Sequence, residues 1–175
     1  LASHYGKFQT LVDSVIGDAD GKLVFKNDEK YVSGIYMLVN NANEIEIEFL
    51  MDDVQQFKIK PDSQNPSKTT INQSPLNIDF RDFNVFLKTK RSEIDVIKTS
   101  FESSNTKSKK AISQKKIEFI ETEISQYKQN YSASHSNTLA LLFKLTKPVD
   151  DFSSLPENQK LSTNEDSLSY LKNNY

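Results

Sequence analysis

Cysteine and tryptophan are absent from the sequence, and glycine and proline are scarce, with four and five residues among 175. Without cysteine the chain can form no disulfide, no thiolate nucleophile and no zinc–thiolate site, and cysteine usage gives no indication of its redox compartment. Glycine is too rare for a glycine-rich phosphate-binding loop, and no Gly-x-Ser-x-Gly elbow occurs. We therefore expect a non-enzymatic chain with no catalytic residues, no cofactor-binding residues, no cofactor and no metal ligands.

An excess of positive charge and a membrane-length apolar run are also lacking. The formal net charge is −2, so there is no net attraction to the phosphate backbone, which dominates nucleic-acid affinity. An apolar run such as residues 139–143 is far shorter than the roughly 20 residues that span a bilayer, and no signal-peptide pattern follows the N-terminus. The sequence therefore predicts neither a nucleic-acid partner nor a transmembrane segment.

The histidines and the aspartate-rich turn do not indicate a metal site. His4 and His135 fall in different predicted parts of the chain, and neither has a carboxylate at ligand spacing. Residues 18–21, Asp-Ala-Asp-Gly, begin like a calcium loop. Lys22 stands where an oxygen ligand is needed, however, and no glutamate closes a twelve-residue loop. We interpret the segment as a tight turn in which Gly21 takes a positive φ.

Two acidic pairs and one basic cluster are interpreted as solvated surface. The pairs at 52–53 and 150–151 are unsuited to joint acid–base chemistry, because adjacent residues on a strand point to opposite faces. The basic cluster could contact anionic lipid or an acidic partner. We favour a solvated loop and helix face, because no aromatic residues are interleaved and the first turn of a helix disfavours cations. The cluster consists of Lys107, Lys109, Lys110, Lys115 and Lys116.

Eleven phenylalanines and seven tyrosines at regular spacing supply enough apolar area for a folded chain. Residues 1–75 alternate apolar and polar positions with a period of two, which predicts an antiparallel β domain of about five or six strands. We expect a meander or a small sandwich, because the connections are too short for parallel crossovers. The strands are expected at residues 22–26, 34–39 as a central strand, 44–49, 55–60 and 69–71.

The strand at 44–49 alternates most clearly. Ile45, Ile47 and Phe49 fall on one face and three glutamates on the other. This pattern predicts that only one face of the strand is buried.

From Pro75 onward the apolar period changes to about 3.5 residues, which predicts a helical region over 76–175. Long helices are expected at 76–102 and 108–131, forming a helical hairpin. A shorter helix is expected at 136–147 with Ser136 as N-cap, and a partial helix at 163–175. Lys90 interrupts the first apolar stripe. The stripes could form a self-association seam, but packing against each other and the sheet is favoured. The predicted fold class is therefore α+β.

Several segments, taken in order, resemble the N-terminal region of Bacteroidetes-type cell-envelope thiol-disulfide oxidoreductases. That region is a β-rich domain of unknown function with a helical linker, placed ahead of a thioredoxin-like domain. The match consists of turn and core residues and spans nearly the whole chain. The segments are residues 1–7, 12–14, 18–25, 34–39, 48–51, 56–59, 74–77, 136–140 and 170–175.

The resemblance implies a non-catalytic accessory region that positions or recognises clients for a thioredoxin-like domain of the same parent chain, which would carry a Cys-x-x-Cys motif. It implies a periplasmic or lipid-anchored location in the cell envelope. It also implies a chain truncated at both ends, with Leu1 inside a strand. The possible partners are that domain and envelope protein clients. The alternatives are a stand-alone envelope ligand-binding protein and an assembly protein that uses the long helices.

Overall fold

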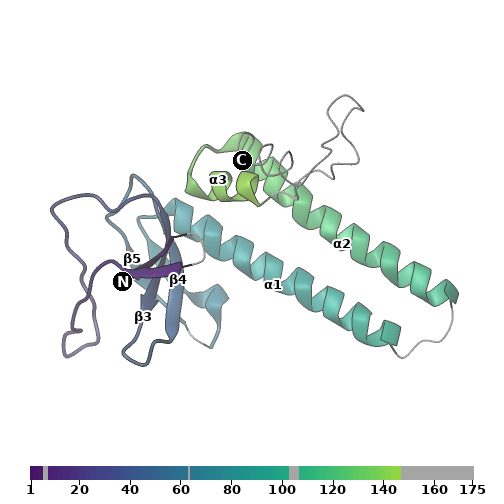
Figure 1. Cartoon of the computed structure of the whole chain (residues 1–175), viewed down its shortest axis with the longest axis horizontal. Helices are drawn as coiled ribbons and strands as arrows, with labels where there is room; N and C mark the ends of the chain where they lie inside the picture. Colours follow the sequence, from purple (N-terminus) through teal and green to yellow (C-terminus); the bar gives the residue numbers. More distant parts are fainter. Residues whose placement is uncertain (6–7, 63, 103–106, 147–175) are drawn as a thin grey trace, which may run out of the picture.

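The computed structural model describes residues 1–5, 8–62, 64–102 and 107–146. They form an α+β fold in which a β-rich end is followed by a helical hairpin and a shorter helix, as Figure 1 shows. The predicted fold class is confirmed. The helix expected at 163–175 lies outside the described residues.

Two antiparallel sheets make up the β-rich end. The four-stranded sheet has the order β2-β1-β3-β4 and contains β1 (Ala2–Tyr5), β2 (Phe8–Leu11), β3 (Gly34–Val39) and β4 (Ile45–Met51). The two-stranded sheet pairs β5 (Lys58–Lys60) with β6 (Thr70–Asn72). A single 3-10 turn, η1 (Pro66–Lys68), precedes β6. The strand expected at 34–39 is internal as predicted, because β3 pairs with both β1 and β4.

The strand expected at residues 22–26 does not form, although the turn before it does. Gly21 has a φ of 74°, and Asp18 Oδ1 accepts hydrogen bonds from the N–H groups of Asp20 (3.1 Å) and Lys22 (2.8 Å). Leu23 and Val24 are exposed, whereas Phe25 packs on the β core. A strand needs a neighbour for its backbone groups, and the apolar alternation of this segment is not matched by burial.

Within residues 44–49 only one face of β4 is buried, as predicted, since Phe49 is buried and Glu46 and Glu48 are exposed. Beyond Phe49, in the C-terminal half of the strand, both faces are covered. Ile45 is 46% exposed, whereas Leu50, on the same face as Glu48, is 0% exposed. Phe49 and Met51 pack into a cluster with Leu1 and Tyr36. Leu50 packs on the other side against helical residues, so this half of β4 is covered on both faces. The period-two pattern did not reveal the second layer, because the helices that form it follow much later in the sequence.

Three helices complete the described fold: α1 (Pro75–Glu102), α2 (Lys107–Ser134) and α3 (Thr138–Leu145). The N-cap of α3 is Asn137 and not Ser136, because the Asn137 side chain accepts a hydrogen bond from Ala140 N–H at 3.0 Å. No helix within the described residues has the length and apolar character needed to cross a membrane.

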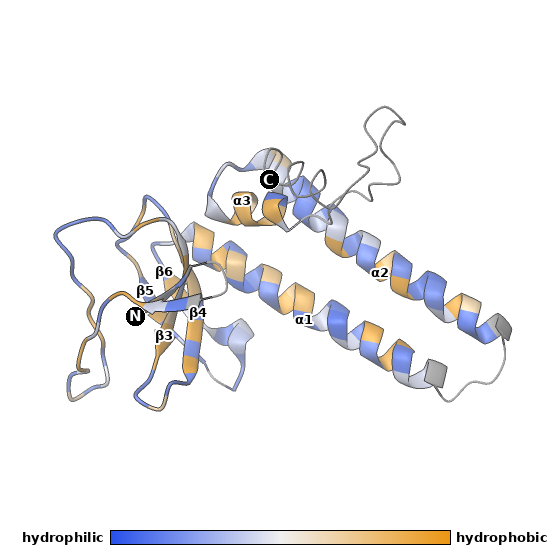
Figure 2. Cartoon of the chain, in the orientation of Figure 1, coloured by the Kyte–Doolittle hydropathy of each residue, from blue (hydrophilic) through white to orange (hydrophobic). Residues whose placement is uncertain are grey.

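The second core cluster joins the three helices to the sheet. Leu50 meets Phe83 of α1 and two residues of α3, Leu139 and Phe143. Figure 2 shows apolar residues concentrated on α3 and on the part of α1 nearest the sheet. Farther along the hairpin, Lys90 of α1 contacts Glu123 of α2 at 3.0 Å. The lysine that interrupts the apolar stripe therefore links the two helices.

Candidate functional site

The two histidines occupy separate places. His4 Nε2 lies 3.6 Å from Glu48 Oε1, a cross-sheet pair that sequence spacing could not reveal. His135 stacks on Tyr131, with ring centroids 4.1 Å apart, and its Nδ1 lies 2.9 Å from Ser134 Oγ. No cluster of three or more histidine or acidic side chains that could hold a metal ion occurs in the part of the chain that the structure describes.

The acidic pair at 52–53 is part of a structural junction. Asp52 Oδ2 accepts a hydrogen bond from Thr138 N–H at 3.2 Å, and Thr138 Oγ1 donates to Met51 C=O at 3.3 Å. The end of β4 is thereby fastened to the start of α3. Asp53 lies 4.0 Å from Lys30 on the exposed surface. The pair at 150–151 lies outside the described residues.

A polar cluster between the helices stabilises the same junction. Tyr131 donates to Asp79 Oδ2 at 2.7 Å and accepts from Asn137 Nδ2 at 2.9 Å. Burial, together with the hydrogen bond to Asp79, raises the pKa of Tyr131 to about 12. This hydroxyl is therefore a neutral hydrogen-bonding group at ordinary pH, and its role is to hold α1, α2 and the start of α3 together.

A groove of about 590 Å³ runs between β4 on one side and α1 with the β5–β6 sheet on the other. Its apolar lining comes from all three, and polar and charged side chains stand among these residues. The apolar residues include Ile45, Ile47, Phe49, Ile59, Ile71, Phe80 and Val85. The charged residues are Glu46, Glu48, Asp62, Arg81 and Lys88. A mostly apolar floor with a few polar groups is typical of binding sites.

The backbone edge of β4 is only partly closed along this groove. Leu50 N–H donates to Asn77 Oδ1 at 2.7 Å, and Asn77 Nδ2 donates to Leu50 C=O at 2.9 Å, so both Leu50 groups point away from β3. Outward-pointing groups recur at every second residue of an antiparallel strand. Glu48 pairs with Met37 in the same uninterrupted register. Its N–H and C=O therefore face outward, and no other described residue forms a hydrogen bond with them.

Negative charge predominates on the β4 side of the groove. Glu46 accepts a hydrogen bond from Asn40 Nδ2 at 2.8 Å, and the Glu48 side chain is 46% exposed. On the opposite wall, Arg81 is held by Asp82 at 2.8 Å and donates to Thr69 C=O at 2.9 Å. The lining holds three carboxylates, from Glu46, Glu48 and Asp62, and two cations, from Arg81 and Lys88. Because Arg81 is already paired with Asp82, the groove keeps an excess of negative charge toward an incoming cation.

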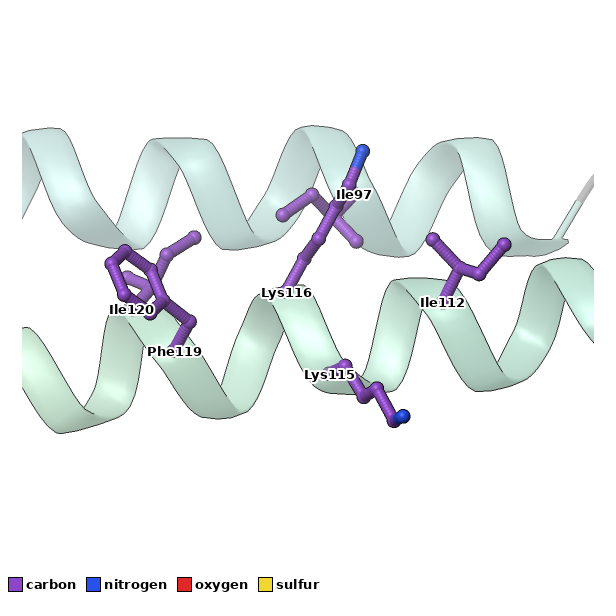
Figure 3. Close-up of a pocket in the computed structure, with 6 residues that line it drawn as sticks. All are labelled: Ile97, Ile112, Lys115, Lys116, Phe119 and Ile120. Carbon is purple, nitrogen blue, oxygen red and sulfur yellow. The ribbon is translucent and has the colours of Figure 1, made fainter.

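A second concave surface lies between α1 and α2, toward the far end of the hairpin (Figure 3). It has a volume of about 390 Å³ and is lined by apolar residues with two lysines of the basic cluster beside them. Phe119 is 66% exposed there. The lining residues are Ile97, Ile112, Lys115, Lys116, Phe119 and Ile120.

The sequence did not point to Asn77 or to the open backbone of Glu48. Asn77 is a single polar residue in the first turn of a predicted helix, and its contact with Leu50 joins residues 27 positions apart in the chain. The alternation of 44–49 did predict exposed glutamates, which the structure confirms for Glu46 and Glu48. A comparison with protein-family models, curated proteins and solved structures found no match to this chain, so the resemblance drawn from the sequence stays a prediction.

Proposed function

We propose that this chain is a non-catalytic accessory region of a cell-envelope thiol-disulfide oxidoreductase, and that it binds polypeptide clients for a thioredoxin-like domain of the same parent chain. The observation that carries the proposal is the groove between β4 and α1. It combines apolar floor, charged rim and an open strand edge, which are the features that recognise polypeptide segments.

The junction around Leu50 supports a positioning role. Leu50, Phe83 and Phe143 form one cluster, and Asp52 and Asn77 add hydrogen bonds between β4 and the helices. A client bound at the groove would therefore be held in a fixed relation to α3. Positioning of this kind raises the effective concentration of a client near a tethered domain.

Binding is tested with the full chain, immobilised and exposed to an array of ten-residue peptides of varied sequence. We expect a reproducible subset of peptides to bind. If none of the peptides binds, client recognition by this chain is refuted.

The link to an oxidoreductase and to the envelope is tested on the parent gene. We expect the coding sequence to continue beyond Tyr175 into a domain with a Cys-x-x-Cys motif, and fractionation of cells to place the product in the envelope. A gene that ends there, or that continues without this motif, contradicts the accessory role and leaves a stand-alone binding protein.

A second candidate function is assembly through the far end of the helical hairpin. The observation that favours it is the exposure of Phe119 and Ile112 beside the apolar surface of α1 and α2. Large exposed apolar side chains that gather at one place are typical of contact surfaces. Sedimentation showing a monomer at all concentrations would exclude self-assembly.

A further inference from the structure

β4 is the outermost strand of its sheet, and the edge that it leaves open borders the groove. An exposed edge is a template for another strand, because its N–H and C=O groups have no partner in the sheet. In this chain Asn77 already occupies one position of that template. Its side-chain amide donates to Leu50 C=O and accepts from Leu50 N–H, which are the two bonds that a neighbouring strand would make.

The next outward-facing position along the strand is Glu48. An antiparallel strand placed beside Glu48 would accept from its N–H and donate to its C=O, continuing the pairing that Asn77 makes at Leu50. Between Leu38 and Val39 the register of β3 and β4 shifts. This irregularity limits the open edge to a short stretch centred on Glu48, so a peptide of a few residues is sufficient to fill it.

The side chains around this position specify the peptide. A residue directly opposite Glu48 would place its side chain on the face of β4 that carries Glu48, and the residues on either side would lie opposite Ile47 and Phe49. Ile47 and Phe49 belong to the apolar cluster that also contains Ile59 of β5. Cross-strand pairing therefore favours a basic residue opposite Glu48 and apolar residues before and after it.

The same charges disfavour a second copy of this chain. Two β4 strands paired in antiparallel fashion around Glu48 would bring glutamates of both copies together, and like charges directly opposite each other destabilise a strand pair. Charge along an edge strand is a common protection against self-pairing. A basic partner converts this repulsion into attraction, so the β4 edge distinguishes a foreign basic segment from its own copy.

We infer that the β4 edge binds an extended peptide of alternating apolar and basic residues, which adds to the sheet as an antiparallel strand opposite Glu48. This inference rests on the proposed function and names the class of client segment. Affinity comes from backbone hydrogen bonds and specificity from the alternating side chains, as in other cases of strand addition.

The test uses a fluorescent peptide, Gly-Val-Lys-Val-Lys-Val-Gly, titrated into the full chain. Two derivatives carry N-methyl groups, one on both lysines and one on two of the valines. In the inferred pairing the lysine N–H groups face β4 and the valine N–H groups face away. We expect lysine methylation to weaken binding by about tenfold, the effect of losing a backbone hydrogen bond and adding a clash. Valine methylation should change affinity much less.

Variants of the protein test the other side of the contact. Glu48→Pro removes the outward N–H without removing a ladder bond to β3, a placement that edge strands tolerate. It should weaken binding by about tenfold, whereas Glu48→Gln, which keeps the N–H and removes the charge, should weaken it by up to about fivefold. In a ¹H–¹⁵N spectrum, the amide of Glu48 should shift and become protected from exchange.

Three results would overturn the inference. They are equal binding of the two methylated peptides, binding of a reordered Gly-Val-Val-Val-Lys-Lys-Gly peptide with the same affinity, and shifts confined to the end of the hairpin. The methylated peptides decide the matter even if Glu48→Pro fails to fold. Should array peptides bind without involving Glu48, only the inference fails. Should no peptide bind at all, the proposed function fails with it.

Discussion

Asn77 is the residue whose loss should reveal most about how β4 is held. It is 2% exposed and forms three side-chain hydrogen bonds. Oδ1 accepts from Leu50 N–H at 2.7 Å, and Nδ2 donates to Leu50 C=O at 2.9 Å and to Ser74 Oγ at 2.9 Å. Asn77→Ala would leave both backbone groups of Leu50 buried without a partner, since Leu50 is 0% exposed.

A buried backbone group that loses its partner costs about 1–3 kcal/mol, so the two groups of Leu50 set a range of about 2–6 kcal/mol. The better helix propensity of alanine returns roughly 0.5 kcal/mol. We therefore expect Asn77→Ala to lower the free energy of unfolding by about 3 kcal/mol. Domains are stable by only about 5–15 kcal/mol, so the variant should fold but be clearly weakened.

Urea denaturation followed by circular dichroism measures this change. With a slope of about 2 kcal/mol per molar urea, the midpoint should fall by about 1.5 M. Asn84→Ala is the matched control, because Asn84 is an exposed asparagine of the same helix; its midpoint should change by the equivalent of about 0.5 kcal/mol at most. A loss below about 1 kcal/mol for Asn77→Ala would refute the view that Asn77 closes the β4 edge.

Three further predictions concern the helices. Lys90→Met completes the apolar stripe and should preserve the melting temperature, whereas Lys90→Glu places like charge beside Glu93 and Glu123 and should lower it in a thermal scan. The hydrogen bond to Glu123 raises the pKa of Lys90, so this contact stabilises the fold at neutral pH and is lost above pH 10.5 as the folded pKa is passed. The pKa of Tyr131 is raised from its ordinary value of 10.0 to about 12, so the stabilisation that its neutral hydroxyl provides is present below pH 10 and is lost between pH 10 and 12. Across that range the urea midpoint should fall less steeply for Tyr131→Phe than for the unsubstituted protein. Phe119→Ser should leave stability nearly unchanged, because Phe119 is mostly exposed. If the hairpin end mediates assembly, this variant should also lower the mass that light scattering measures at high concentration. Val96→Ser, which replaces another exposed apolar residue, on α1, is the control.

Local periodicity was sufficient to predict the fold class and the long helices, because each stripe is written in neighbouring residues. Phe83, Ile94 and Ile120 are apolar residues of the two predicted long helices, and all three are buried. Contacts between distant segments were beyond its reach. Leu50 directly follows the alternating segment 44–49, and its burial depends on α1 and α3, which come later in the sequence. Residues 22–26 alternate in the same way but have no partner strand. The groove is likewise formed by β4, β5, β6 and α1 together, so it could not be predicted from any one segment of the sequence.

β4 thus divides into two halves with different physical roles. Its C-terminal half is covered on both faces, its edge is closed at Leu50 by Asn77, and Asp52 directly after it is bonded to the start of α3. Its N-terminal half has Ile45 exposed and the outward backbone groups of Glu48 open to the groove. Since Glu48 and Leu50 are only two positions apart, the half of β4 that is packed on both faces fixes the geometry of the open half, and no ordering of the edge is needed before a peptide adds to it. Substitution of Asn77 should therefore lower the stability of the fold, whereas substitution of Glu48 should weaken peptide binding.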